Sequence, residues 1–190
     1  MKVLMIDNYD SFTYNLVHYL ESDENVIVTV WKNDEINFDM LNQFDRIVIS
    51  PGPGLPEESG EIIRLIQEQS GKKPILGICM GHQAIGVAFG AEIKNLNEVL
   101  HGVSKPSIQK GNSKLFENLD QQFEIGRYHS WVIDKSTLSN DFKITLKDEK
   151  DEIMAMEHKK YDLVGLQFHP ESVLTPDGFQ IIQNWLDINP

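Results

Sequence analysis

Short apolar runs rich in β-branched residues alternate with amphipathic segments in the first half of the chain. The runs cover residues 3–6, 26–31, 47–49 and 75–78. Continuous apolar runs of this length, bounded by turn residues, are typical of strands that are covered on both faces, as in a parallel sheet. The first half is therefore predicted to contain buried parallel strands.

The segments between these runs have helical spacing. Residues 12–20, which Asp10 or Ser11 can cap by accepting a backbone N–H bond, carry apolar side chains at Phe12, Leu16, Tyr19 and Leu20. Residues 58–69 repeat the pattern, with polar side chains toward water. Regular alternation of strands and helices predicts a doubly wound α/β domain.

The second half of the chain has a different pattern. From about residue 91 to 168 it shows short alternating segments, including 142–146, 153–156 and 163–168, which favour antiparallel strands or an edge extension of the same sheet. A last helix is predicted at about residues 176–188, with one face formed by Phe179, Ile182, Trp185 and Leu186. No repeat or linker divides the chain, so we predict a single domain over residues 1–190. Its expected fold is an open, doubly wound, mostly parallel sheet with helices on both faces and an antiparallel extension.

Composition and charge exclude several classes of protein. The 17 basic and 29 acidic residues give a formal net charge of −12, which argues against nucleic-acid binding because phosphate contacts need surplus Lys and Arg. The N-terminus reaches Asp7 too early for the apolar stretch of about 7–15 residues that a secretory signal needs. No run approaches the roughly 18 apolar residues of a membrane span. We therefore predict a cytoplasmic protein without membrane contact, and the single cysteine cannot form an internal disulfide.

The single cysteine, Cys79, lies where an apolar strand meets a helix-like segment. Gly77 and Gly81 stand two residues before and after it. Small residues at these positions allow the sharp turn of a nucleophile elbow, with cysteine in place of serine. The following helix N-terminus favours a thiolate, which is the nucleophilic form. The alternative is a small buried residue at a strand end, a common place for free cysteine.

A cysteine nucleophile needs a base, and His169 is the best placed of the six histidines. It follows the apolar run 163–168, and Glu171 stands two residues later, on the same side of an extended segment, where it can fix the tautomer of the ring. Taken alone, a His-Pro-Glu tripeptide is more often a surface turn. His82 is expected to be structural, His129 belongs to another candidate pocket segment, and His18, His101 and His158 are expected at the surface or in packing.

The loop Pro51-Gly52-Pro53-Gly54 follows the predicted strand at residues 46–50. Its glycines permit close approach of a ligand to the backbone, and open α/β sheets bind ligands at this end of their strands. A backbone N–H of the loop could form an oxyanion hole with that of Met80. The alternative is a plain tight loop, and a phosphate site is disfavoured because no Lys-Ser/Thr follows.

Three motifs in this order and spacing resemble those of class I (triad) glutamine amidotransferases: Gly77-Ile78-Cys79-Met80-Gly81-His82-Gln83, His169-Pro170-Glu171 and Pro51-Gly52-Pro53-Gly54. The opening Met5-Ile6-Asp7-Asn8-Tyr9-Asp10-Ser11-Phe12-Thr13-Tyr14-Asn15-Leu16 and Tyr128-His129-Ser130 narrow the resemblance. These segments are similar to the small subunits of anthranilate synthase and of 4-amino-4-deoxychorismate synthase. The resemblance covers essentially the whole chain and implies a flavodoxin-like fold.

The resemblance implies a catalytic triad. Cys79 would attack the side-chain amide of glutamine to give a thioester and ammonia, His169 would move the protons, and Glu171 would orient His169. Water would then release glutamate. The N–H groups of Gly54 and Met80 would hold the oxyanion, a type of contact worth roughly 2.7–4 kcal/mol in barrier height.

The resemblance also implies a glutamine-binding set and a partner. Glutamine would be held by Gly52, Pro53, Gly54, Gln83, Ser130 and Trp131. Ammonia would pass to a large chorismate-binding synthase subunit on another polypeptide, because nothing in the chain could serve as a synthase domain. No cofactor or metal is expected in this chain, and magnesium, if used, would belong to the partner. We favour anthranilate synthase over aminodeoxychorismate synthase on overall resemblance alone.

Some positions depart from the family, and other functions stay open. Trp131 and Leu55 replace residues that are often Leu and Thr, and residues 101–105 depart from the usual His-Gly-Lys, a difference that concerns partner contact. A peptidase, a redox protein or a catalytically silent subunit could share the cysteine elbow. A redox role would leave His169 and Glu171 without a function. A catalytically silent subunit would not need Cys79, His169 and Glu171 together.

Overall fold

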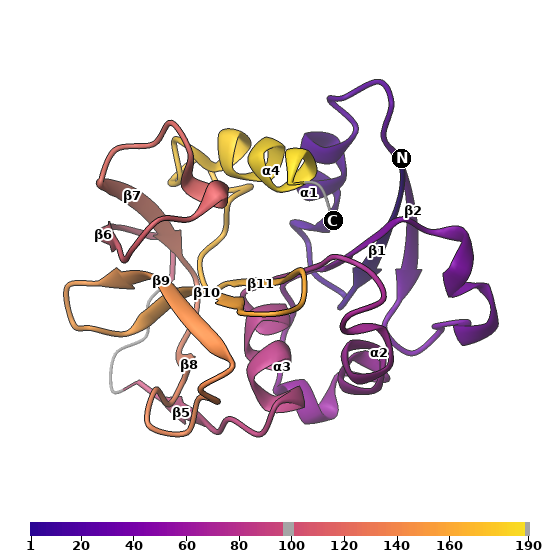
Figure 1. Cartoon of the computed structure of the whole chain (residues 1–190), viewed down its shortest axis with the longest axis horizontal. Coiled ribbons are helices and arrows are strands. Elements are labelled where there is room, and N and C mark those ends of the chain that lie inside the picture. Colours follow the sequence, from indigo (N-terminus) through magenta and orange to yellow (C-terminus); the bar gives the residue numbers. More distant parts are fainter. Residues whose placement is uncertain (97–100, 189–190) are drawn as a thin grey trace.

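The computed structural model describes residues 1–96 and 101–188. Within these residues the chain forms a large sheet with the strand order β2-β1-β3-β4-β11-β10-β9-β6-β7, and a separate small sheet of β5 and β8. Helices cover both faces of the large sheet (Figure 1). The predicted doubly wound α/β architecture is confirmed.

Five strands form the parallel half of the large sheet: β2 (Ile27–Lys32), β1 (Lys2–Asp7), β3 (Arg46–Ile49), β4 (Ile75–Ile78) and β11 (Leu163–Leu166). Their order corresponds to the 2-1-3-4-5 order of flavodoxin-like folds. The carboxyl ends of parallel strands meet at one edge of the sheet. This edge therefore brings together the segments that follow β1, β3, β4 and β11.

The antiparallel half consists of β10 (Ile153–His158), β9 (Phe142–Asp148), β6 (Val103–Gln109) and β7 (Gln122–Arg127). It confirms the predicted extension, although residues 97–100 of that stretch lie outside the described residues. The small sheet pairs β5 (Ile93–Asn95) with β8 (Trp131–Ile133) and was not predicted as a separate unit.

The core divides into two layers, one on each face of the sheet. Val3 and Met5 pack on the face covered by α1 (Thr13–Leu20) and α4 (Gly178–Asp187). The intervening Leu4 and Ile6 pack on the opposite face, against α2 (Ile62–Gln69) and α3 (Met80–Ala88). Because successive side chains of a strand point to opposite faces, one continuous apolar run supplies both layers. The 3-10 segments η1 (Phe38–Gln43), η2 (Pro56–Glu58) and η3 (Lys114–Phe116) connect these elements.

Two expectations about packing were wrong. β2 is not covered on both faces, because it lies at the edge of the sheet, and its Ile27 is 61% exposed. On α4, Phe179 is 45% exposed, whereas Ile181 is fully buried. The helix begins at Gly178, later than predicted, and its buried face does not include Phe179. The Phe179 ring instead packs edge-on against Tyr19.

Two helix starts also differ from the predictions. α2 begins at Ile62 rather than at residue 58, because Gly60 has a φ of +58° and interrupts the preceding turn. Asp10 accepts the N–H of Phe12 (2.7 Å) just before α1, whereas Ser11 is exposed and makes no capping bond. Of the two candidate caps, Asp10 therefore holds the entry to the helix.

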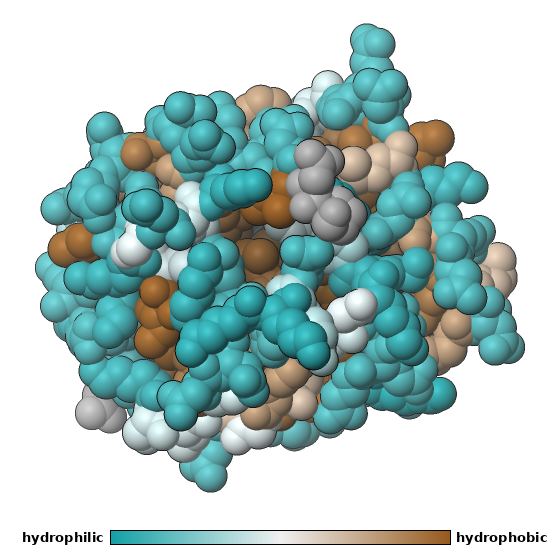
Figure 2. All heavy atoms as spheres, in the orientation of Figure 1, coloured by the Kyte–Doolittle hydropathy of each residue, from teal (hydrophilic) through white to brown (hydrophobic). Residues whose placement is uncertain are grey.

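The view of the surface in Figure 2 shows polar side chains over most of one face, with small, separated apolar areas. Among residues 1–96 and 101–188, no helix has the length and apolar character needed to cross a bilayer.

Candidate active site

Cys79 stands at a sharp turn between β4 and α3, at the carboxyl edge of the sheet. Its φ of 53° and ψ of −102° are unusual for a residue with a side chain. Such strain persists only where the surroundings hold it, and it is common at catalytic positions. α3 begins at Met80, so its first N–H groups have no partner within the helix and favour negative charge on the neighbouring sulfur.

The glycines on either side of Cys79 are required by close backbone contacts. A Cβ on Gly77 would lie 2.4 Å from the carbonyl oxygen of Gly81, and a Cβ on Gly81 would lie 2.6 Å from that of Ile49. No side chain fits at either position without moving the backbone. The predicted elbow is thus present, with α3 packed directly against β3 and β4.

His169 and Glu171 form a buried pair. His169 Nδ1 and Glu171 Oε1 are 2.6 Å apart, and both side chains are almost fully buried. The segment from His169 to Glu171 was predicted to be extended, but it forms a turn. In this turn the Ser172 N–H donates to the His169 carbonyl. Pro170 fixes the backbone of this turn, so the predicted pairing is right although its geometry differs.

The charge state of His169 depends on its neighbours. Burial alone would lower its pKa, but the negative charges of Cys79 and Glu171 outweigh burial and raise the pKa well above 6.5. Because Glu171 accepts at Nδ1, this nitrogen carries the proton, and Nε2 has no hydrogen-bond partner among the described residues. Nε2 can therefore hold the proton taken from the Cys79 thiol, and the raised pKa favours this state, an imidazolium beside a thiolate.

Two cavities meet at Cys79. The inner cavity, of about 200 Å³, is lined by Gly52, Gly54, Cys79, Met80, Gln83, Tyr128, His129, Ser130 and Trp131. Its lining includes every residue predicted for the oxyanion hole and for glutamine binding except Pro53. It is smaller than the roughly 300–1,000 Å³ of typical drug-sized sites, and so suits a ligand such as an amino acid.

The outer cavity, of about 400 Å³, also has Cys79 in its lining. Its lining includes Phe12, Pro53, His101, Tyr128 and His169. The ring centroids of Tyr128 and His169 are 4.9 Å apart, and Tyr128 lines both cavities. Pro53 lines this second cavity together with Gly52, which lines both cavities.

The loop after β3 approaches the other loops closely. A Cβ on Gly52 would lie 2.5 Å from the Cβ of Asn8, and Gly54 has a φ of +83°. The Asn8 amide donates to the Ser50 carbonyl (2.8 Å), which joins the ends of β1 and β3. The loop is thus held between β1 and the elbow by its glycines.

Two glutamines connect the inner cavity to the sulfur. Gln83 Nε2 donates to the Trp131 carbonyl (2.8 Å) and to Gln167 Oε1 (3.2 Å). Gln167 Nε2 lies 3.9 Å from Cys79 Sγ. Gln167 was not predicted as a site residue, although it precedes His169 by two positions after an apolar strand, the same spacing that drew attention to Glu171.

Three other histidines differ in their surroundings. His82 is fully buried beside Gly165, which lowers its pKa to about 3, and it lines neither cavity, as expected for a structural residue. His129 lines the inner cavity, as predicted. His101 is exposed, as expected, and it also lines the outer cavity beside Tyr128.

Asp7 anchors the loop that follows β1. Residues of this loop, but not Asp7 itself, line the outer cavity. Its buried carboxylate accepts from Thr13 Oγ1 (2.9 Å), the Asp10 N–H (3.1 Å) and Lys32 Nζ (2.5 Å). Burial raises the pKa of Asp7, but these hydrogen bonds outweigh burial and bring the pKa below 3.8. A depressed folded-state pKa stabilises the fold above the unfolded-state pKa, and the contribution disappears as pH falls through the folded-state pKa.

We expect Asp7→Asn to lower the free energy of unfolding by about 2–4 kcal/mol near neutral pH, because hydrogen bonds to a buried charged group are lost. The deficit should shrink as pH falls below 3.8 and the wild-type carboxylate becomes protonated, because the folded-state pKa of Asp7 is lowered. Urea titrations of the wild-type and Asp7→Asn proteins at each pH measure this difference in the free energy of unfolding. Asp39→Asn, at an exposed position, is the control. An equal deficit at both pH values would contradict this account of Asp7.

Among the described residues, no group of three or more His, Cys, Asp or Glu side chains could hold a metal ion.

Comparisons with known proteins agree with this geometry. The family model described as glutamine amidotransferase class-I matches residues 4–188. Anthranilate synthase component 2 of Cyanophora paradoxa is 46% identical over 189 residues, which cover 97% of this chain and 98% of that protein. Aminodeoxychorismate synthase component 2 of Klebsiella aerogenes is 44% identical over 187 residues, which cover 97% and 99%.

A further relative is longer than this chain. The bifunctional protein TrpGD of Thermotoga maritima is 43% identical over 190 residues, which cover 98% of this chain but 32% of that protein. Among solved structures, a putative GMP synthase protein from Thermoplasma acidophilum has a TM-score of 0.87 and 25% identity, covering 98% of this chain and 92% of that one.

Proposed function

Because the chain belongs to the class-I glutamine amidotransferase family, we propose that it hydrolyses glutamine with a Cys79, His169 and Glu171 triad and delivers the ammonia to a chorismate-using synthase subunit. The observation that carries this proposal is the strained elbow at Cys79, which lines the same outer cavity as His169 while Glu171 holds the far nitrogen of that ring.

The first half of the reaction forms a thioester. His169 Nε2 takes the thiol proton, and Cys79 Sγ attacks the side-chain amide carbon of glutamine. The N–H groups of Gly54 and Met80 stabilise the developing oxyanion, because preorganised donors act most strongly where charge develops. His169 then returns its proton to the leaving nitrogen, and ammonia departs.

The second half releases glutamate. A water molecule gives a proton to His169 and attacks the thioester carbon, and the sulfur leaves. Glu171 keeps the ring in one tautomer and stabilises the imidazolium in both halves. The inner cavity, lined by Gly52, Gly54, Gln83, Ser130 and Trp131, suits the amino-acid substrate. Pro53 lines the adjoining outer cavity.

The proposed partner is a large synthase subunit on a separate chain. The relatives named above are components 2 of anthranilate synthase and of aminodeoxychorismate synthase, two synthases with more than one component. We assign the chain to anthranilate synthase, and any magnesium requirement to its partner.

The test mixes the chain with the large subunit of each synthase, chorismate and magnesium, and supplies either glutamine or an ammonium salt. We expect anthranilate from glutamine only when the mixture holds both this chain and the large subunit of anthranilate synthase. The ammonium salt should support synthesis without this chain. Aminodeoxychorismate instead of anthranilate would reject the pathway assignment, whereas product from ammonium but never from glutamine would reject the amidotransferase proposal.

A further inference from the structure

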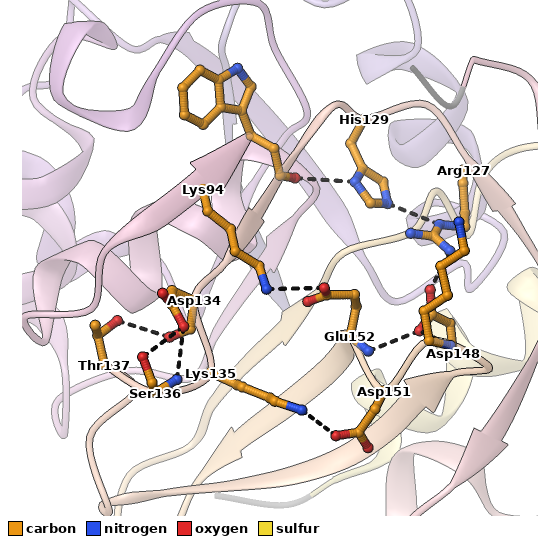
Figure 3. Close-up of polar contacts among 12 residues, drawn as sticks. Lys94, Arg127, His129, Asp134, Lys135, Ser136, Thr137, Asp148, Asp151 and Glu152 are labelled. Carbon is orange, nitrogen blue, oxygen red and sulfur yellow. Dashed lines mark hydrogen bonds and ion pairs between the residues drawn. The ribbon is translucent and has the colours of Figure 1, made fainter. Parts of the chain in front are cut away.

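Arg127, the last residue of β7, lies in a buried network beside the inner cavity. Its Nη1 donates to Asp148 Oδ2 (2.5 Å), and its Nε donates to His129 Nε2 (3.2 Å). The three residues are only 4%, 5% and 5% exposed. Figure 3 shows the guanidinium between the Asp148 carboxylate and the His129 ring.

The contact with Arg127 determines which nitrogen of His129 carries its proton. Arginine can only donate, so His129 Nε2 must accept, and a neutral ring then has its proton on Nδ1. His129 Nδ1 lies 3.1 Å from the Trp131 carbonyl and donates to it. Burial, followed by the charge of Arg127, lowers the pKa of His129 to about 3, so the ring stays neutral at physiological pH.

The Trp131 carbonyl lies where this network reaches the candidate site. It accepts from His129 Nδ1 and from Gln83 Nε2, and Gln83 also donates to Gln167. Gln167 Nε2 in turn lies 3.9 Å from Cys79 Sγ. A continuous series of contacts therefore leads from Arg127, through the wall of the inner cavity, to the sulfur.

The far end of the network is fixed by backbone groups. Asp148 Oδ1 accepts the N–H groups of Lys150 (2.9 Å) and Glu152 (2.8 Å), in the turn between β9 and β10. Asp148 therefore cannot follow a displaced arginine. A buried ion pair adds little net stability, so stability alone does not account for this one.

We propose that Arg127 is a positioning residue for glutamine: by holding His129 as its Nδ1–H tautomer, it fixes the Trp131 carbonyl and with it the amide of Gln83 in the inner cavity. This inference rests on the proposed function, because it takes the inner cavity as the glutamine site. Arg127 lines neither cavity, so it acts through His129 and not by touching substrate.

The test removes both charges together, with Arg127→Met and Asp148→Asn in one chain, so that no buried charge is left unpaired. Cys79 alkylation is followed by intact-protein mass spectrometry with two reagents. One is a diazoketone analogue of glutamine, which must bind before it reacts, and the other is iodoacetamide, which reports the reactivity of the thiol alone. Neither reagent requires the synthase subunit.

We expect the double variant to bind the diazoketone at least about tenfold more weakly, since the lost contacts are charge-assisted. Its second-order rate with iodoacetamide should stay within about twofold of wild type. Arg46→Met is the matched control: Arg46 is equally buried at 4% exposure but donates to the Trp185 and Ile188 carbonyls near the C-terminus. It should change neither reaction.

His129→Asn provides a second test, because an asparagine amide can place a donor near the position of Nδ1. It should retain more diazoketone affinity than His129→Ala. The inference is overturned if the folded double variant binds the diazoketone as wild type does, or if both reagents slow equally. If the wild-type chain itself is not alkylated by the diazoketone and glutamine gives no protection, the proposed function fails instead.

Discussion

Replacing Cys79 by serine is expected to lower glutamine hydrolysis by at least about 10⁴-fold, a loss of the size seen when a catalytic nucleophile is removed. The thiolate is a strong nucleophile at neutral pH, whereas a serine hydroxyl stays protonated unless a matched base activates it. The backbone at this position holds a positive φ with a side chain of this size, and serine differs from cysteine by one atom. The loss should therefore reflect chemistry and not unfolding.

The measurement is glutamate formation by the wild-type and Cys79→Ser chains, each mixed with the synthase subunit. Ammonium-dependent synthesis by the same mixtures is the control, since it bypasses the thioester. It should be unchanged if the variant still folds and binds its partner. Because Cys79 is the single cysteine of the chain, glutaminase activity that persists in the variant would remove the thioester mechanism altogether.

The parallel half of the sheet could be predicted closely because its signal is local. β4 has the predicted bounds, Ile75–Ile78, since Pro74 precedes the apolar run and the elbow follows it. The elbow itself could also be predicted, because the two glycines mark a sharp turn whatever the rest of the fold does. Edge position is not a local property, so the exposure of Ile27 on β2 was not foreseen.

The catalytic candidates were predictable from spacing and resemblance, but their supporting contacts were not. His169 and Glu171 are two positions apart in the sequence, so their pairing needs only a local turn. Arg127 and Asp148 are 21 positions apart and meet only once the antiparallel strands have formed. Neither the composition nor the periodicity of the sequence indicates that these two residues form a pair.

Gln167 is an intermediate case. It lies within the run 163–168 that precedes His169, and the rule that places alternate residues on one side of an extended segment applies to it as well. Its contact with Gln83 joins residues 84 positions apart, so its partner could not be read from the sequence. The position was therefore predictable, whereas the hydrogen bond was not.

The second large effect is expected from Glu171→Gln, which should lower glutamine hydrolysis by up to about 10⁴-fold while the chain stays folded. A carboxylate can only accept, which keeps the proton on His169 Nδ1 and leaves Nε2 free. A glutamine amide can donate to Nδ1 instead. The proton then moves to Nε2, which can no longer take a proton from Cys79.

The pH dependence of this variant separates orientation from charge. Glu171 is one of the groups that raise the pKa of His169, so its neutralisation should lower that pKa. A raised folded-state pKa stabilises the fold fully below the unfolded-state value of 6.5, and this contribution is lost as pH rises through the folded-state pKa. The difference in melting temperature between wild type and Glu171→Gln should therefore narrow at alkaline pH.

Glu157→Gln is the matched control, because Glu157 is a partly buried carboxylate that pairs with Lys143 and lines neither cavity at Cys79. It should leave glutamine hydrolysis within about twofold of wild type, as expected for a pair with little energetic weight. Glu171→Asp keeps the charge but shortens the reach to Nδ1, so it should retain more activity than Glu171→Gln. If glutamine and aspartate at this position lose activity equally, charge and tautomer are irrelevant, and the 2.6 Å contact serves only to pack the turn that carries His169.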